Sequence, residues 1–316
     1  MRLDCLLTAL PPYTRSMNPA PLRYVKMNGL GNEIVVVDFR AGGGPLKPRD
    51  VRTIAENPAT AFDQMMVLHP PRTPDTAAFV SIFNTDGSES AACGNGTRCI
   101  AWLEHERTGR AEFVFETRAG LLDVTVAGRA SITVDMGRPR FGWADIPLSE
   151  PFHDTRGIEL QIGPIDAPVL HSPSVVNIGN PHVVFWVDDP VDGYDLGRFG
   201  PMIENHPLFP ERVNVTLAEV QSRTALKIRT WERGAGLTRA CGTAACAAAV
   251  SAMRKRLTDR RVTVTLPGGP LVIDWATNDH ILMTGPAEFE HEGDLDALLS
   301  PETAAEATLV PHGRLS

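Results

Sequence analysis

The 316-residue sequence lacks long apolar runs, runs of basic residues and a dense set of cysteines. Its longest apolar stretch, residues 244–253, includes Ser251 and is too short to cross a membrane as a helix. The net charge is −8, so neither a nucleic acid nor an anionic membrane surface is an expected partner. Five cysteines in a chain of this length form no disulfide framework, which favours a reducing, cytoplasmic location.

Motifs for metals and cofactors are missing as well. The sequence has no CxxC pair and no GxxxxGK phosphate loop, and its nine histidines do not cluster at metal-binding spacing. None of its four lysines lies in a recognisable cofactor-lysine context, which disfavours a pyridoxal enzyme. The glycine-rich segment at residues 29–33 lacks the third glycine of a dinucleotide loop and precedes its strand. We therefore expect a protein without a metal or cofactor.

An internal repeat organises the chain. Ala92-Cys93-Gly94 recurs 148 residues later as Ala240-Cys241-Gly242. Three further pairs share this offset: Gly31-Asn32 with Gly179-Asn180, Gly120 with Gly268, and Gly137 with Gly285. In both copies a β-rich run ends nine residues before the cysteine, and a helical stretch begins just after it. The register predicts two similar α+β halves.

The domain boundaries follow from this register. We interpret residues 1–20 as an N-terminal extension, 21–139 as the first half and 140–285 as the second half. Residues 286–316 are expected to pack back on the first half. The helix predicted at residues 242–255 is apolar on nearly all sides, so we expect it inside a curled sheet rather than on its surface.

Cys93 and Cys241 lie in glycine-containing turns where the predicted helices begin. Unpaired N–H groups and a partial positive charge at a helix start stabilise a thiolate, so we expect both thiols to have a lowered pKa. The same N–H groups bind carboxylates. If the halves close on each other, one thiolate and one thiol would face the two sides of an acidic carbon, as stereochemical inversion requires.

Other readings of the cysteines remain open at this point. Cys93 and Cys241 could form a disulfide, or one could be the nucleophile of a hydrolase with His182 as its base. Cys99 and Cys246 fall in the middle of the predicted helices, where a cysteine is typically a small buried apolar residue.

Eight sequence blocks resemble the diaminopimelate epimerase family of cofactor-independent, two-cysteine amino-acid epimerases. They are KMNGLGNE (26–33), FDQ (62–64), FNTDGSE (83–89), ACGNGTRC (92–99), IGNPH (178–182), FPERVN (209–214), WERGAGLTRACGTAAC (231–246) and LPGG (266–269). The resemblance implies two pseudo-symmetric halves, each a mixed β-sheet or barrel around a central helix, with the active site in the cleft between them. It also implies conversion of LL-diaminopimelate to the meso form, in lysine and peptidoglycan precursor synthesis, by an enzyme that is often a homodimer.

The resemblance also implies roles for individual residues. Cys93 and Cys241 match the acid–base pair. Four residues match the donors around the reacting carboxylate: Gly94, Asn95, Gly242 and Thr243. His182 and Glu232 match residues that flank the reacting centre and its ammonium group, and Gln64 matches a glutamine near the site. The polar set that reads the substrate and its distal end would be Asn32, Asn84, Asn180, Asn214 and Arg233.

Four features depart from the family pattern. Asn28 replaces a frequent His, Glu33 a frequent Asp and Ala244 a frequent Gly, and residues 57–61 replace a glycine-rich segment. These changes concern the entrance loop and the substrate preference. Three alternatives therefore stay open: another two-thiol racemase or isomerase, a non-catalytic protein that binds dicarboxylic amino acids, and a metal- or pyridoxal-dependent enzyme.

Overall fold

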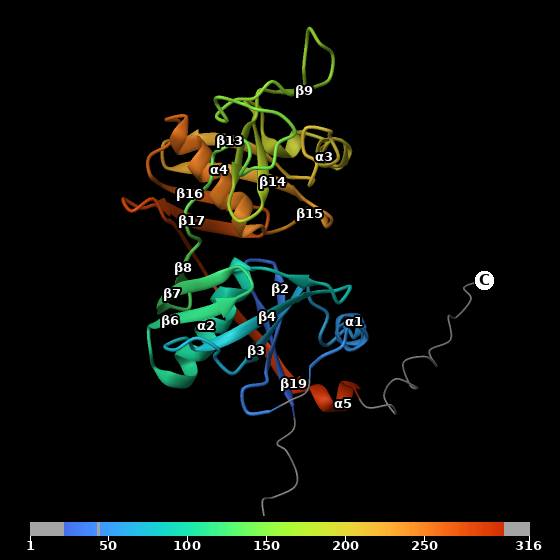
Figure 1. Ribbon diagram of the computed structural model, residues 1–316, viewed down its shortest axis with the longest axis vertical. Helices are drawn as coiled ribbons and strands as arrows, with labels where there is room; N and C mark the ends of the chain where they lie inside the picture. The colour runs from blue at the N-terminus through green and yellow to red at the C-terminus, as the bar shows by residue number, and fades with distance from the viewer. Residues whose placement is uncertain (1–21, 43–44, 300–316) are drawn as a thin grey trace, which may run out of the picture.

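A computed structural model describes residues 22–42 and 45–299. The expected extension at residues 1–20, and residues 300–316 of the expected C-terminal return, lie outside this described part. The two halves of the repeat lie one above the other along the long axis of the molecule (Figure 1).

The first half contains eight strands and two helices among its described residues. A long connection between β2 and β3 carries α1, and α2 lies between β5 and β6. The elements are β1 (Arg23–Asn28), β2 (Glu33–Asp38), α1 (Pro48–Glu56), β3 (Gln64–His69), β4 (Ala78–Asn84), β5 (Glu89–Ser90), α2 (Gly94–Thr108), β6 (Glu112–Thr117), β7 (Gly120–Gly128) and β8 (Ser131–Asp135).

The second half repeats this order. Its elements are β11 (Ser174–Asn177), β12 (Pro181–Trp186), η1 (Val191–Gly193), α3 (Leu196–Glu204), β13 (Asn214–Ser222), β14 (Ala225–Glu232), β15 (Gly236–Thr238), α4 (Gly242–Arg254), β16 (Arg261–Leu266), β17 (Gly269–Trp275) and β18 (Ile281–Gly285). A small two-stranded sheet of β9 (Gln161–Ile162) and β10 (Leu170–His171) precedes them.

The strand pairing is the same in both halves. The first two strands pair antiparallel, the second and third parallel, and the third and fourth antiparallel. The fourth strand then pairs in parallel with the strand that follows the helix, and an antiparallel meander completes the half. The sequence repeat is therefore a structural repeat.

Two further pairings join the halves into one sheet of seventeen strands in the described part of the chain. β8 of the first half pairs antiparallel with β18 of the second. After β18, the chain returns to the first half as β19 (Glu288–Asp294), which pairs antiparallel with β1, and α5 (Leu295–Leu299) packs against α1. The returning segment descends from the second half to the first in Figure 1.

Each half wraps its sheet around one helix. Residues 244–250 of α4 are fully buried, and α4 packs against β11 to β14 and β16 to β18. Alanine at most of these positions lets the surrounding strands approach the helix axis closely. The prediction of a helix enclosed by a curled sheet is confirmed, as is the α+β fold with two pseudo-symmetric halves. No described helix is long and apolar enough to span a bilayer.

Candidate active site

Each of the two repeated cysteines is the N-cap of a central helix. Cys93 precedes α2, and its Sγ accepts a hydrogen bond from the Gly96 N–H at 3.2 Å. Cys241 precedes α4, and its Sγ lies 3.5 Å from the Thr243 hydroxyl. The thiol-bearing residues are 8% and 5% exposed, so both sulfurs lie inside the molecule.

The two helix starts lie side by side in the interior. A Cβ atom at Gly94 would lie 2.5 Å from the Met283 Cε, and one at Gly242 would lie 2.9 Å from the Met283 Sδ. One thioether thus fills the space beside both glycines. Asn95 spans the two halves, since its Nδ2 donates to the Ala240 carbonyl oxygen at 3.4 Å. The fold therefore brings the turns of Cys93 and Cys241 together from opposite halves.

The repeat extends to polar contacts beside the helix starts. In the first half, the Asn95 Nδ2 lies 3.5 Å from the Asn32 Oδ1. In the second half, the equivalent pair is Asn180 and Thr243, with 3.4 Å between the Nδ2 and the Oγ1. Asn32 also donates to Asp63 at 3.0 Å, which fixes the orientation of its amide.

The loop at residues 29–32 connects the α2 start to the second half. A Cβ atom at Gly29 would lie 3.1 Å from the Asn95 Cβ. Leu30 and Gly31 both have positive φ, at 68° and 83°, and the Asn28 Oδ1 accepts from the Gly31 N–H at 2.6 Å. The Leu30 carbonyl oxygen lies against Gly268 in the turn between β16 and β17. This contact joins the two halves close to the thiols.

His182 is fully buried beside this cluster. Its Nε2 lies 2.8 Å from the Asn180 Oδ1, and the amide of Asn180 is oriented by Thr243, so Nε2 is the protonated nitrogen. Its Nδ1 is buried without a hydrogen-bond partner. Burial, with a smaller effect of Arg233, lowers the pKa of His182 to about 3. A neutral, weakly basic imidazole does not suit the hydrolase reading, which needs His182 to accept a proton from a thiol.

Glu232 ends β14 and lies partly buried beside the Cys241 thiol. Its Oε1 accepts from the Thr238 hydroxyl at 2.5 Å, and its carboxyl group faces the Cys241 thiol. Burial raises the pKa of Glu232 above its usual range, while Thr238 and Cys241 act in the opposite direction. The charge of Glu232 also reaches Cys93, so one carboxyl group acts on both sulfurs.

The remaining predicted residues lie at or next to the ends of neighbouring strands. His182 lies beside Asn214 in the β12–β13 register, and Gln64 lies opposite Asn84 in the β3–β4 register. Asn214 donates to the Pro181 carbonyl at 3.0 Å and accepts from the Arg233 N–H at 3.0 Å. The side chains of Gln64 and Asn84 make no hydrogen bond to the rest of the predicted set within the described residues. Asn84 instead donates to Ser88 at 3.0 Å.

Thr238 and Met283, which are outside the predicted set, also contact the cluster. Thr238 donates to Glu232 and lies three residues before Cys241, inside the WERGAGLTRACG block. Its place in this block is the sequence signal that could have predicted its contact with the site. Met283 comes from the apolar strand β18, and nothing in its sequence context indicates a position between two helix starts.

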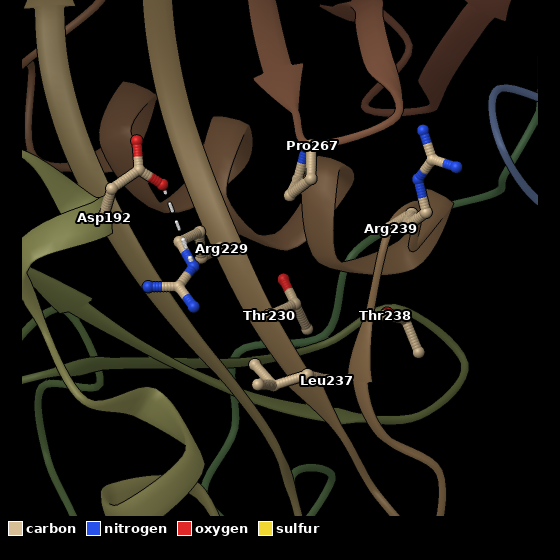
Figure 2. A pocket seen from close by; sticks show the side chains of 7 residues that line it. All are labelled: Asp192, Arg229, Thr230, Leu237, Thr238, Arg239 and Pro267. Carbon is tan, nitrogen blue, oxygen red and sulfur yellow. Dashed lines mark ion pairs between the residues drawn. The ribbon is translucent and has the colours of Figure 1, made fainter.

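Two cavities of the described structure do not contain the thiols. One, of about 380 Å³, is lined by Asp192, Arg229, Thr230, Leu237, Thr238, Arg239 and Pro267 (Figure 2). A second, of about 340 Å³, includes Lys26 and Glu33, which form an ion pair at 2.5 Å, and Ala59 and Ala61 of the segment that departs from the family pattern. Neither is lined by Cys93 or Cys241. No three His, Cys, Asp or Glu side chains of the described part are placed to hold a metal ion.

The expected lowering of the thiol pKa values is wrong for this form of the protein. Burial raises the pKa of Cys93 to about 11, although the Gly96 N–H and the Arg98 charge oppose it. Burial, together with Glu232, also raises the pKa of Cys241 well above its usual value. The helix start provides the expected N–H groups, which stabilise a thiolate. The loss of hydration on burial destabilises the thiolate by a larger amount.

The raised thiol pKa values predict a loss of stability at high pH. A thiol whose pKa is higher in the folded than in the unfolded chain keeps its proton on folding. The contribution of such a thiol to the unfolding free energy is complete below pH 9.0, the usual thiol pKa. It declines as the pH rises toward the pKa in the folded protein, which is about 11 for Cys93 and about 12 for Cys99 and Cys246. The decline is about 1.4 kcal/mol per pH unit for each buried thiol.

Urea unfolding at pH 8 and pH 10 measures this effect. The double variant Cys99→Ala/Cys246→Ala is expected to lose less unfolding free energy between the two pH values than the unmodified protein. Equal unfolding free energies of the unmodified protein at pH 8 and pH 10 would contradict the prediction.

Comparison with known proteins gives the family. The family model described as "Diaminopimelate epimerase" matches residues 24–142 and 174–290. A protein named diaminopimelate epimerase from Methylobacterium sp. (strain 4-46) is 60% identical over 282 residues, covering 88% of this chain and 96% of that protein. One of the same name from Brucella anthropi is 58% identical over 273 residues, covering 86% and 91%.

Solved structures of more distant proteins share the fold. A predicted epimerase from Pseudomonas aeruginosa superposes with a TM-score of 0.61 at 19% identity, covering 86% of this chain and 98% of that one. A hydroxyproline epimerase from Agrobacterium vitis, with bound trans-4-hydroxy-L-proline, gives 0.60 at 17% identity, covering 89% and 94%. The family model and the two proteins named diaminopimelate epimerase match most of the chain. The chain therefore belongs to the diaminopimelate epimerase family.

Proposed function

We propose that this protein is a diaminopimelate epimerase that interconverts LL- and meso-diaminopimelate without a cofactor. The observation that carries the proposal is the meeting of two cysteines from equivalent places in two halves. Each caps a central helix, and the helix starts share the Met283 side chain. The names of relatives at 58–60% identity support the choice of substrate.

In the reaction, one proton is removed from the α-carbon and another proton is added to its opposite face. A thiolate on one side takes the α-proton and becomes a thiol. The thiol on the other side gives its proton to the opposite face and becomes a thiolate, so the protein returns to the same total charge. Helix N–H groups after Gly94 and Gly242, with Asn95 and Thr243, hold the carboxylate while negative charge develops on it.

The surroundings of the two thiols differ in how they affect ionisation. Arg98 is a fully buried cation on α2, and its charge favours the Cys93 thiolate. Glu232 faces Cys241 and disfavours a second negative charge there. The surroundings of Cys93 therefore favour the thiolate form more than those of Cys241 do.

The other predicted residues recognise the two amino-acid ends of the substrate. The unpartnered Nδ1 of His182 accepts a hydrogen bond from the α-ammonium group, and the Glu232 carboxylate attracts its charge. The polar set reads the distal end, with the Arg233 guanidinium as the partner of the distal carboxylate. This set comprises Asn32, Asn84, Asn180, Asn214 and Arg233, and Gln64 is a further glutamine near the site.

Deuterium uptake from heavy water tests the proposed function. The purified protein, dialysed and without additions, is expected to place deuterium on the α-carbon of LL-diaminopimelate and to produce the meso form. A panel of other amino acids distinguishes a different two-thiol racemase. Tight binding without exchange would instead identify a binding protein, and activity that requires a metal or pyridoxal phosphate would contradict the cofactor-free mechanism.

We also propose a homodimer in a cytoplasmic location. The family resemblance supports the dimer. The four cysteines of the described part are free thiols, which fits a reducing compartment. Light scattering of the purified protein and fractionation of its source cells test these two points separately from the activity.

A further inference from the structure

Glu204, the last residue of α3, is a buried carboxylate outside the predicted site. It is 5% exposed and accepts hydrogen bonds on both of its oxygens. The Trp231 indole N–H donates to Oε2 at 2.7 Å, and the Gly234 N–H donates to Oε1 at 2.9 Å. Arg212 adds an ion pair at 3.2 Å. Burial of a carboxylate is costly without such donors, so these contacts hold Glu204 and its partners in one arrangement.

The partners of Glu204 enclose the residues proposed to bind substrate. Trp231 comes directly before Glu232, and Gly234 directly after Arg233. Gly234 has a φ of +78° at the turn between β14 and β15. The residues on either side of Glu232 and Arg233 are thus hydrogen-bonded to one carboxylate at the end of α3. The position of Glu232 and Arg233 depends on these two hydrogen bonds.

Packing strengthens the same connection. A Cβ atom at Gly200 of α3 would lie 2.4 Å from the Trp231 ring, so the helix backbone and the indole are in direct contact. The orientation of the indole is therefore set by Glu204 at one edge and by α3 across its face.

The first half holds its equivalent turn in another way. Asn84 occupies the repeat position of Glu232, and its turn is held by contacts within the turn and by Arg52 of α1, which donates to the Asp86 carbonyl oxygen at 3.0 Å. The Asn84 side chain donates to Ser88 at 3.0 Å, and the Ser88 N–H donates to the Asp86 carboxylate at 2.8 Å. A carboxylate that reaches the turn from a separate helix is thus a feature that distinguishes the second half from the first.

We propose that Glu204 is a positioning residue that fixes the Glu232–Arg233 turn for substrate binding, through its bonds to Trp231 and Gly234. This inference rests on the proposed function, because Glu232 and Arg233 are substrate-binding residues only there. Glu204 does not itself touch the substrate. Its removal displaces groups that bind the ground state and the transition state alike, and such a loss raises KM more than it lowers kcat.

The test compares Glu204→Gln with Glu104→Gln. Glu104 is a matched control because it is also a buried carboxylate, 2% exposed and bonded to Arg40 and Arg107 at 2.6 Å, but it lies in the last part of α2, away from the turn. In Glu204→Gln, an amide NH2 group replaces one carboxylate oxygen and cannot accept a hydrogen bond from the Trp231 or Gly234 N–H. The substitution is expected to raise KM for LL-diaminopimelate about tenfold or more, with a smaller change in kcat. Glu104→Gln is expected to lower the melting temperature but to leave KM unchanged.

Hydrogen exchange gives a readout that does not depend on activity. The Gly234 amide is expected to lose protection in Glu204→Gln and to keep it in Glu104→Gln. Failure of the unmodified protein to exchange any α-proton would reject the proposed function, while loss of Gly234 protection would still report the positioning contact. Equal KM values in the two glutamine variants would overturn the inference.

A second variant covers the case in which Glu204→Gln does not fold. Trp231→Phe keeps the ring against Gly200 but removes the indole N–H. It is expected to raise KM by severalfold, and an unchanged KM in this variant would equally overturn the inference.

Discussion

Replacement of either Cys93 or Cys241 by alanine is expected to lower the rate of interconversion about 10³-fold or more. Each inversion needs a base on one side and an acid on the other, and a single proton-transfer group contributes roughly 10²–10⁴-fold. Loss of one thiol leaves the remaining thiol unable to complete the reaction in either direction. Conversion of LL-diaminopimelate, followed by chiral chromatography, measures the effect.

The other two buried cysteines provide the control. Cys99 and Cys246 are fully buried in the middle of α2 and α4. Alanine at either position is expected to cost stability through a small cavity, with activity per folded molecule within a few-fold of the unmodified protein. Full activity in Cys93→Ala or Cys241→Ala would reject the two-thiol mechanism, whatever the effect of the controls.

Gly268→Ala is expected to lower kcat/KM about 100-fold. The new Cβ atom would lie 1.9 Å from the Leu30 carbonyl oxygen, so the β16–β17 turn and the 29–32 loop must separate. A backbone clash of this size costs about 3 kcal/mol, which reduces the population of the form with the halves in contact about 100-fold. The two halves keep their own helices and sheets, so the melting temperature is expected to fall only slightly.

Gly193→Ala is the matched control for this substitution. An added Cβ atom at Gly193 meets no atom within 4 Å, and Gly193 has no positive φ. Its kcat/KM is expected to equal that of the unmodified protein. If Gly268→Ala also retains full kcat/KM, the contact of Leu30 with Gly268 has no part in forming the active site.

Much of the architecture could be predicted because the duplication constrains it twice. The helix predicted from residue 94 is α2, and the strand predicted to end at residue 84 is β4. An apolar pattern that is ambiguous in one copy is resolved by its counterpart 148 residues away. Local patterns also locate Cys93 and Cys241, because a helix start has recognisable residues around it.

Properties that depend on contacts between distant segments could not be predicted in this way. The thiol pKa values are set by burial between two halves, which outweighs the helix start visible in the sequence. Met283 and Glu204 reach the cluster through packing, and the exposed Glu56 at the repeat position of Glu204 gives no indication of this role. Short-range patterns carry no information about such contacts.

The pairing of β8 with β18 determines how the halves are able to move. The chain crosses from the first half after Asp135, which pairs with Leu282, and crosses back after Gly285, which pairs with Ile132. Both covalent connections therefore leave from the same short ladder. Separation of the halves by translation would break this ladder. Any relative movement of the two halves must therefore pass through the β8–β18 ladder, on which both covalent connections converge.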